Sequence, residues 1–179
     1  MSLALDPNDP AALGPSAAPA DLIKESDTAN FGTDVIEPSM EVPIIVDFWA
    51  PWCGPCKQLG PLLEKLVTQA GGLVRMVKIN VDENKELAGQ LRIQSIPAVF
   101  AFKDGQPADG FVGAQTERQI KDFIGRLIGD AKTPLDAALE QAKTAMEEGN
   151  IDAAGAIYMD VMRQDPENAE AIAGLIRCS

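Results

Sequence analysis

The chain contains no histidine, three cysteines and one tyrosine, and aromatic residues make up only 5% of it. Without histidine there is no Ser-His or Cys-His catalytic pair, no histidine general base and no histidine-bound metal. Three cysteines, an odd number, do not indicate the framework of structural disulfides that small secreted proteins use. These absences exclude histidine-dependent catalysis and do not suggest a disulfide-stabilised secreted fold.

Positive charge is also scarce, because 15 Lys and Arg stand against 27 Asp and Glu, which gives a formal net charge of −12. Nucleic acids and anionic membranes require a basic face, so we expect neither as a partner, whereas other proteins remain open as partners. No apolar run approaches the roughly 20 residues of a membrane span. No positive charge precedes Lys24, so no secretory signal is predicted and we expect a cytoplasmic protein.

The 179 residues suffice for one ordinary domain with a small appendage, and 46% hydrophobic residues are enough to build a core. Residues 1–20, rich in alanine and proline, predict a disordered leader. Residues 21–130 alternate strand-like and helix-like segments, which predicts an α/β domain whose mixed central sheet is flanked by helices. Residues 134–179 carry only helical patterns. Most of them predict an all-α helical hairpin, and the last residues of this range begin the helical pattern again without completing it.

Within the α/β region, the run from Pro43 to Ala50 is short, apolar and β-branched, as in a strand buried on both faces. Pro61 predicts a kink in the helix that contains it. Asp104-Gly105 predicts the turn of a hairpin between the last two strands. The expected strands are 22–23, 43–50, 73–81, 98–102 and 110–112, and the expected helices are 31–37, 58–69, 84–91 and 116–128.

Cys53 and Cys56 lie where the buried strand 43–50 turns into a helix. Cysteines three apart at a helix start have adjoining sulfurs, so an intramolecular disulfide can close. Cys53 lies at the helix N-terminus, where unpaired N–H groups and the macrodipole favour a thiolate. Cys56 lies about one turn inside as a shielded resolving thiol, while Gly54 and Pro55 permit and stiffen the tight approach. The pattern predicts a redox-active dithiol.

Three other interpretations of the cysteines compete with this one. A zinc site needs four ligands, which one close pair, the distant Cys178 and no histidine do not supply. A static structural disulfide is disfavoured in a reducing compartment. Two inert core cysteines remain an alternative, although the adjacent Trp52 and the strand-to-helix position favour a reactive pair. Cys178 itself is interpreted as a helix-packing thiol.

The segment from Val46 to Lys57, VDFWAPWCGPCK, resembles the active-site segment of the thioredoxin family. The resemblance covers roughly residues 22–129 and continues through residues 78–82, 95–98 and 112–114. It implies the thioredoxin fold and dithiol–disulfide exchange on protein disulfides. It also implies thioredoxin reductase as the electron donor and no cofactor beyond the redox disulfide Cys53–Cys56.

Asp47 lies in an otherwise apolar strand and has two interpretations. It is either a strand-end residue that reaches water, or a buried carboxylate with a raised pKa that takes the proton of Cys56 through water. Thioredoxin-like proteins use such a carboxylate together with a lysine, and the matching lysine is Lys78 on the neighbouring strand. The resemblance therefore adds Asp47 and Lys78 to the two cysteines as catalytic residues.

The resemblance also implies where a substrate binds. An X-Pro bond is cis in only about 5–6% of cases in general, but the resemblance implies a cis bond between Ile96 and Pro97, with Pro97 packed against the disulfide. The backbone before Pro97 is then free to pair with an extended peptide. Trp49 is better explained as core. The expected substrate-binding residues are Trp52, Gly54, Pro55, Ile96, Pro97 and, within the apolar rim 112–114, Gly113.

In the helical region, Ala154 and Tyr158, followed by Pro166, resemble the second half of a tetratricopeptide repeat. Ala138 and Ala145 stand where the repeat usually has aromatic residues, so a generic helical hairpin stays an alternative. Residues 135–179 span about 1.3 repeats of 34 residues, which predicts an incomplete array.

A thioredoxin-like domain joined to such helices resembles the bacterial chaperedoxin family. That resemblance implies that the helical region holds clients and passes them to chaperones. The alternative function is therefore a redox-linked holdase, in which client binding is primary and reductase turnover secondary. Ile172, Leu175 and Ile176 are apolar residues of an unfinished repeat and predict weak self-association.

Overall fold

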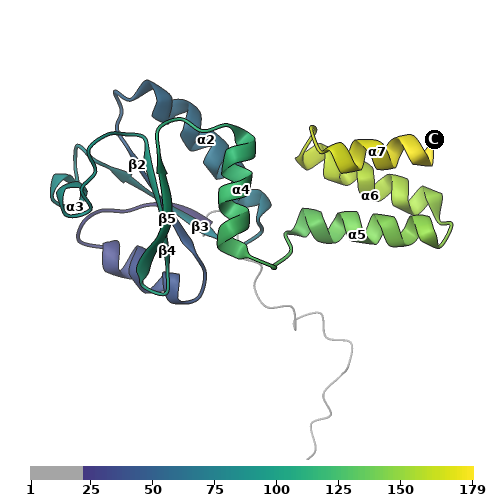
Figure 1. Ribbon diagram of the computed structural model, residues 1–179, viewed down its shortest axis with the longest axis horizontal. Helices are drawn as coiled ribbons and strands as arrows, with labels where there is room; N and C mark the ends of the chain where they lie inside the picture. Colours follow the sequence, from purple (N-terminus) through teal and green to yellow (C-terminus); the bar gives the residue numbers. More distant parts are fainter. Residues whose placement is uncertain (1–21) are drawn as a thin grey trace, which may run out of the picture.

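The computed structural model describes residues 22–179, so the leader predicted for residues 1–20 lies outside the described residues. Residues 23–128 form a five-stranded sheet with helices on both faces, and three further helices lie beside it (Figure 1). The predicted α/β class, with its mixed sheet and helical C-terminal region, is confirmed. None of the helices between residues 22 and 179 is both long and apolar enough to cross a bilayer.

The strands lie in the order β1-β3-β2-β4-β5, in which β1, β3 and β2 are parallel and β4 and β5 are antiparallel to their neighbours. The strands are β1 (Ile23–Glu25), β2 (Ile44–Trp49), β3 (Arg75–Asn80), β4 (Ala98–Lys103) and β5 (Gln106–Val112). Central β2 is buried from Ile44 to Phe48 because helices cover both faces. β5 begins four residues before its predicted start, because a largely exposed edge strand tolerates the polar residues and the proline at 106–109.

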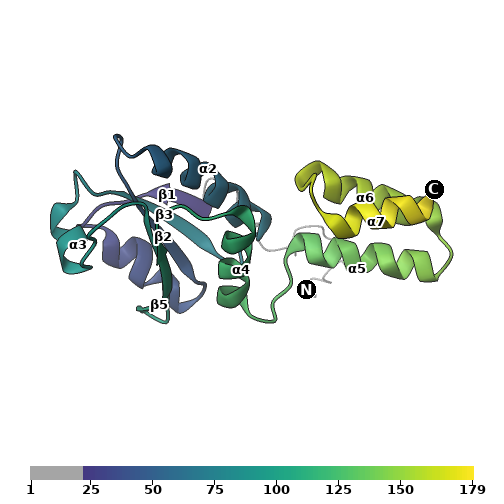
Figure 2. The same cartoon turned by 45° about the horizontal axis from the view of Figure 1, so that its top comes forward.

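Two hydrophobic clusters lie on opposite faces of the sheet. On one face, α2 (Gly54–Gln69) and α4 (Glu117–Ile128) pack through residues such as Leu63 and Phe123. The other face is covered by α3 (Lys85–Gln90), the π-helix η2 (Gly32–Ile36) and the 3₁₀ turn η3 (Pro38–Met40) (Figures 1 and 2). The helix predicted over 31–37 is thus a π-helix, whose wider turn is closed by a 2.9 Å hydrogen bond from the Glu37 N–H to the Gly32 carbonyl.

α2 begins at Gly54, four residues before the predicted start at residue 58. Cys53 is its N-cap, and the Cys53 sulfur accepts a hydrogen bond from the Cys56 N–H at 3.2 Å. Pro55 lies in the first turn, where its missing N–H leaves no donor without a partner. Hydrophobic periodicity starts only at Leu59, so it could not reveal this first turn. α2 continues through Pro61 to Gln69, and the kink expected at Pro61 stays a prediction.

The helical region consists of α5 (Pro134–Glu147), α6 (Ile151–Gln164) and α7 (Ala169–Cys178), each begun by an N-cap side chain: Thr133, Asn150 and Asn168. The three helices share a hydrophobic cluster that is separate from those of the sheet. At its centre, Tyr158 is fully buried and its ring lies against Gly174, where a β-carbon would come within 2.4 Å of a ring carbon. The small residue at 174 is therefore what allows α7 to pack on α6.

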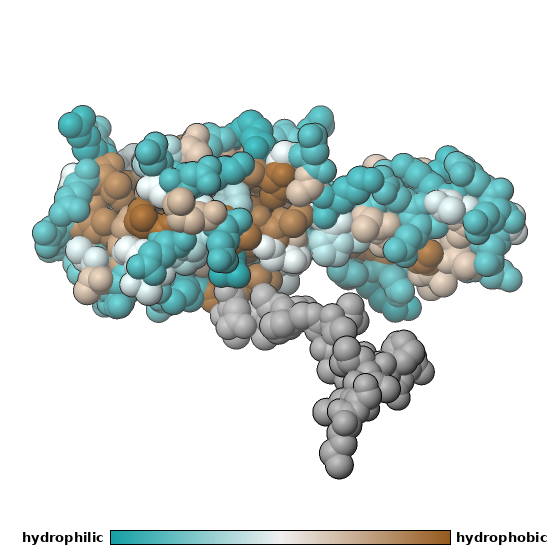
Figure 3. Space-filling view, turned by 90° about the horizontal axis from the view of Figure 1, so that it is seen from below, coloured by the Kyte–Doolittle hydropathy of each residue, from teal (hydrophilic) through white to brown (hydrophobic). Residues whose placement is uncertain are grey.

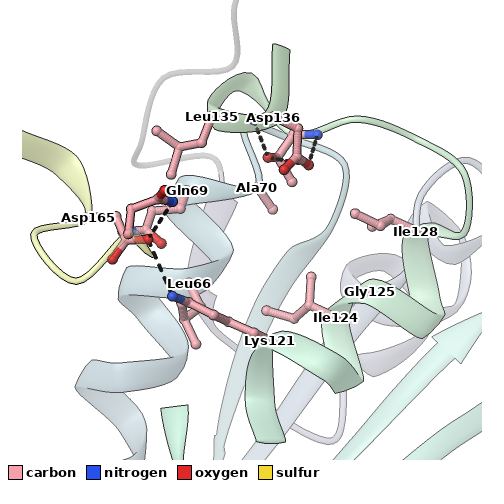
Figure 4. Close-up of a pocket in the computed structure, with 12 residues that line it drawn as sticks. Leu66, Gln69, Ala70, Lys121, Ile124, Gly125, Ile128, Leu135, Asp136 and Asp165 are labelled. Carbon is pink, nitrogen blue, oxygen red and sulfur yellow. Dashed lines mark hydrogen bonds and ion pairs between the residues drawn. The ribbon is translucent and has the colours of Figure 1, made fainter. Parts of the chain in front are cut away.

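A joint of polar contacts holds the helical region against the C-terminal half of α2 and the side of α4 (Figure 4). The Gln69 side-chain amide donates to the Gln164 carbonyl at 2.9 Å, and the Lys121 Nζ lies 3.4 Å from Asp165 Oδ2. Between these contacts lies a cavity of about 250 Å³, lined by Leu66, Ile124 and Leu135 among others. The two parts therefore meet across an incompletely filled space and not through a shared core.

We expect Gly71→Ala to loosen this joint. Gly71 has φ +63°, and a β-carbon there would lie 2.4 Å from Cγ of Pro134, the first residue of α5. An alanine in this left-handed backbone conformation lowers the stability of the folded state by about 1 kcal/mol. The steric clash with Pro134 in addition favours a displacement of α5. Small-angle X-ray scattering should show a larger radius of gyration than for Gly89→Ala, a helical glycine with open space around it. Identical scattering profiles for the two variants would contradict the expectation.

Candidate active site

The two cysteines lie on the turn that joins β2 to α2. The chain leaves β2 at Trp49, and the Cys53 N–H donates to the Ala50 carbonyl at 3.1 Å, which closes the turn before α2. Cys53 and Cys56 are joined by a disulfide, with their Cα atoms 5.3 Å apart. The structure therefore contains the close cysteine pair in its oxidised form, with Cys53 at the helix N-terminus as the spacing predicted.

The disulfide is shielded on its inner side and bordered by exposed residues on its outer side. Cys53 and Cys56 are 4% and 6% exposed and pack on the buried Ala50. Gly54 and Pro55 are exposed beside them. Trp52 is 68% exposed, in contrast to the half-buried Trp49, so the distinction drawn between the two tryptophans agrees with the structure.

Asp82 holds the exposed Trp52 in place and was not singled out by sequence reasoning. The Trp52 indole N–H donates to the Asp82 carboxylate, with N–O distances of 3.0 and 3.2 Å. Asp82 follows β3 as Trp52 follows β2, and the carboxyl ends of neighbouring parallel strands meet at one edge of the sheet. That register was the signal that could have revealed the pair.

The predicted cis bond between Ile96 and Pro97 is confirmed. Pro97 is buried, and its carbonyl accepts a hydrogen bond from the Gly113 N–H at 2.8 Å. Ile96 packs against the cluster formed by Ala50 and the two cysteines. The structure thus brings Ile96, Pro97 and Gly113 together on one side of the disulfide, with Trp52 on the adjoining turn; their role in substrate binding stays a prediction.

Asp47 is a buried carboxylate. It is 1% exposed, and neither of its carboxylate oxygens has a hydrogen-bond partner in the described structure. Burial raises the pKa of Asp47 from 3.8 to about 6, against the opposing field of the Lys78 ammonium and with a smaller contribution from the Glu64 carboxylate. The interpretation of Asp47 as a strand-end residue that reaches water is therefore wrong.

Asp47 and Cys56 line the same cavity, which has a volume of about 230 Å³. The other residues around it are Trp49, Ala50, Pro51, Lys57, Gly60, Pro61 and Lys78. A cavity of this size has room for water molecules, and the Asp47 carboxylate and the Lys78 ammonium are polar groups in its lining. The transfer of a proton from the Cys56 thiol to the Asp47 carboxylate through water in this cavity stays a prediction.

Lys78 lies opposite Asp47 in the β2–β3 register, but its ammonium pairs with a third charged residue. The Lys78 Nζ is 3.0 Å from Glu64 Oε1 and 5.5 Å from the centre of the Trp49 ring. Sequence reasoning missed Glu64. Because Cys56, Gly60 and Glu64 follow at intervals of four residues on α2, they lie on one helix face. This spacing could have identified Glu64.

Among residues 22–179 there is no group of three or more histidine, cysteine, aspartate or glutamate side chains that could hold a metal ion. The chemistry that the arrangement does offer is thiol–disulfide exchange. A disulfide lies at a helix N-terminus beside the exposed Gly54 and Pro55, and Cys56 shares a cavity with the Asp47 carboxylate, whose pKa is raised to about 6.

Comparisons with known proteins agree with this site. The thioredoxin family model matches residues 22–126. The chain is 48% identical over 98 residues to thioredoxin 1 of Synechococcus elongatus, which covers 55% of this chain and 90% of that protein. It is 41% identical over 100 residues to thioredoxin of Haemophilus influenzae, which covers 56% of this chain and 92% of that protein.

It is also 46% identical over 89 residues to mitochondrial thioredoxin of Mus musculus, which covers 50% of this chain. The match spans about half, 54%, of that longer protein. The matched family region contains the whole β2–α2 turn, the buried Asp47 and the cis bond before Pro97. The chain belongs to the thioredoxin family.

Proposed function

We propose that this protein is a dithiol–disulfide oxidoreductase that reduces disulfides of client proteins. One observation supports the proposal most directly: the Cys53–Cys56 disulfide lies at the N-terminus of α2, and its inner cysteine shares a cavity with the buried Asp47. A static disulfide needs neither the helix N-terminus nor a nearby proton acceptor. A redox pair uses both.

In the first step, the reduced Cys53 acts as a thiolate, which the N–H groups at the start of α2 favour. Its sulfur attacks one sulfur of the client disulfide, so a Cys53–client disulfide forms and the client S–S bond breaks. The other client sulfur leaves as a thiolate and takes a proton from solvent. The client peptide lies along Ile96 and Gly113, with Trp52 at its side.

In the second step, Asp47 takes the proton of the Cys56 thiol through water in the shared cavity. The Cys56 thiolate attacks the Cys53 sulfur, the mixed disulfide breaks, and the second client sulfur leaves as a thiolate that is then protonated. Two electrons have passed from the dithiol to the client. Thioredoxin reductase, using NADPH, restores the dithiol, and the cytoplasm is the expected compartment.

The test is reduction of insulin disulfides with thioredoxin reductase and NADPH. We expect NADPH to be consumed and the insulin B chain to precipitate, at a rate proportional to the concentration of this protein. Cys178→Ser is the matched control, because Cys178 lies on α7 against Met146 and outside the site. Failure of the wild-type chain to reduce insulin, even when supplied in the dithiol form, would contradict the proposal.

A second function is favoured by the helical region, namely holding of unfolding clients by tetratricopeptide-like helices, with transfer to chaperones. Ile172 and Ile176 on α7 are 38% and 70% exposed, although they belong to an amphipathic helix whose other side packs on α6. Figure 3 shows that, on the face drawn there, the helical region is mostly hydrophilic, with small apolar patches. Such patches offer contact points for an apolar client segment.

Client holding can be separated from redox chemistry in the full chain. We expect the double variant Cys53→Ser/Cys56→Ser to delay the heat-induced aggregation of a model client as well as the wild-type chain does. Adding Ile172→Ser and Ile176→Ser should remove this protection, since the two exposed side chains supply the apolar contact. Aggregation curves that do not differ from those without the protein would exclude the holdase function.

A further inference from the structure

Asp47 and Lys78 do not form an ion pair in this structure, although they lie opposite each other in the sheet. Asp47 and Lys78 are partners in the β2–β3 register, so their side chains leave the sheet on the same face. Both carboxylate oxygens of Asp47 nevertheless remain without a hydrogen-bond partner in the described structure. The Lys78 ammonium contacts Glu64 at 3.0 Å instead.

Resting on the proposed function, we propose that Glu64 is a positioning residue for the resolving step: it binds the Lys78 ammonium, keeps it from pairing with Asp47, and so leaves the Asp47 carboxylate free to accept the Cys56 proton. Glu64 comes from the third turn of α2 and does not line the cavity that Asp47 and Cys56 share. It therefore acts through Lys78 and not on the sulfurs.

The surroundings of Lys78 show why one carboxylate controls its position. Its Nζ lies over the Trp49 ring, and the Lys78 side chain is 24% exposed, while that of Glu64 is 35% exposed. Lys78 lines the cavity and Glu64 does not, so the ion pair joins a cavity residue to a residue outside it. The lysine stem is flexible. Its register partners with a carboxylate are the exposed Glu25 on β1 and the buried Asp47 on β2, and of these two Asp47 lines the same cavity as Lys78. Without Glu64, the Lys78 ammonium can therefore turn into the cavity and pair with Asp47. An ion pair there would occupy an oxygen that the proton needs.

The other elements packed against Asp47 carry few competing charges. On the β4 side, Asp47 faces the apolar Val99 in register. On the α2 side, Gly60 leaves space next to Asp47 Oδ2, and Lys57 lines the same cavity. The charged groups that act on the pKa of Asp47 are Lys78, which lowers it, and Glu64, which raises it. Removing Glu64 leaves the Lys78 ammonium to lower the pKa of Asp47 without an opposing negative charge.

The first measurement is the titration of the Asp47 carboxyl by carbon NMR in the oxidised full chain, which requires no turnover. We expect Glu64→Gln to move the titration midpoint of Asp47 to lower pH by about half a pH unit or more. Glu64→Asp keeps the negative charge, so its Asp47 midpoint should stay close to that of the wild type. Glu147→Gln, an exposed residue on α5 with the same change of net charge, should leave it unmoved. An unmoved or higher midpoint in Glu64→Gln would overturn the proposal.

The second measurement follows the resolving step itself. The dithiol protein, in a Cys178→Ser background that removes the third thiol, reacts with 5,5′-dithiobis(2-nitrobenzoate). Stopped-flow absorbance separates the first thiolate, released by the attack of Cys53 on the reagent, from the second, released by the attack of Cys56 on the mixed disulfide. We expect Glu64→Gln to slow the second release about threefold at neutral pH and to leave the first unchanged. A lowered Asp47 midpoint with an unchanged second release would overturn the role in resolution.

The two measurements also distinguish a failure of the role proposed for Glu64 from a failure of the oxidoreductase function on which that role depends. If wild-type protein gave no second release, the proposed oxidoreductase would fail whatever the Glu64 variant did. If wild-type protein resolved normally and Glu64→Gln resolved equally fast, only the role of Glu64 would fail. A purely structural contribution of Glu64 would alter stability but not shift the Asp47 midpoint.

Discussion

Cys56→Ser is expected to stop turnover and leave the chain covalently attached to its client through Cys53. The reason is positional: Cys53 is the N-cap of α2, whereas Cys56 lies one turn inside and shares its cavity with Asp47. With serine at position 56 the first exchange still occurs, but no thiolate follows to break the mixed disulfide. Turnover should fall by at least about a thousandfold.

Electrophoresis without reductant measures this outcome as a band at the summed mass of chain and client, which a thiol reagent removes. Cys53→Ser is the matched comparison and should give neither turnover nor the adduct, because the attacking sulfur is gone. A Cys56→Ser protein that turned over insulin at the wild-type rate would show that the order of attack is wrong. An adduct that required Cys178 would lead to the same conclusion.

Asp47→Asn should raise the free energy of unfolding at pH 7 by up to about 3 kcal/mol. The pKa of Asp47 is about 6 in the folded protein and near 3.8 in the unfolded chain, and each unit of difference corresponds to about 1.4 kcal/mol. At any pH between these two pKa values, the folded state binds more protons than the unfolded state. Wild-type stability therefore falls as pH rises from about 4 to about 6, then stays level as far as Asp47 is concerned.

Urea unfolding of the wild type and of Asp47→Asn from pH 4 to pH 8 measures this difference. We expect the two curves to meet near pH 4 and to separate as pH rises, with the variant more stable. The same variant should slow the resolving step, so stability and activity change in opposite directions. A variant that was less stable than the wild type at pH 7 would show that the Asp47 carboxylate is satisfied by contacts other than those described.

The parts of the site that lie on one continuous segment could be predicted from the sequence. The cysteine spacing, the preceding apolar strand and Asp47 within that strand all belong to residues 43–57, so local pattern reveals them. Glu64 and Asp82 were missed because their roles depend on register. Glu64 matters only once β3 is known to lie beside β2 and α2 to pack over both, which no local pattern states.

The differences in the fold have similar physical causes. The first turn of α2 contains glycine, proline and cysteine, and it is helical because of a capped N-terminus, not because of an apolar stripe. Edge strand β5 extends through polar residues because only one neighbour pairs with it. In the π-helix η2, the pattern of apolar side chains does not determine which backbone carbonyl each N–H group bonds to. Pattern reasoning succeeded where burial controlled the structure.

The two ends of α2 serve different parts of the molecule, and this separation sets a distance. The disulfide caps its N-terminus, while Gln69 and Gly71 at its other end meet the helical region. At 1.5 Å per residue, the 16-residue helix is about 24 Å long. A client bound to both places at once must span that gap with about seven residues of extended chain. Under the two proposed functions, a client segment that is extended over this stretch can contact the disulfide and the helical region at the same time.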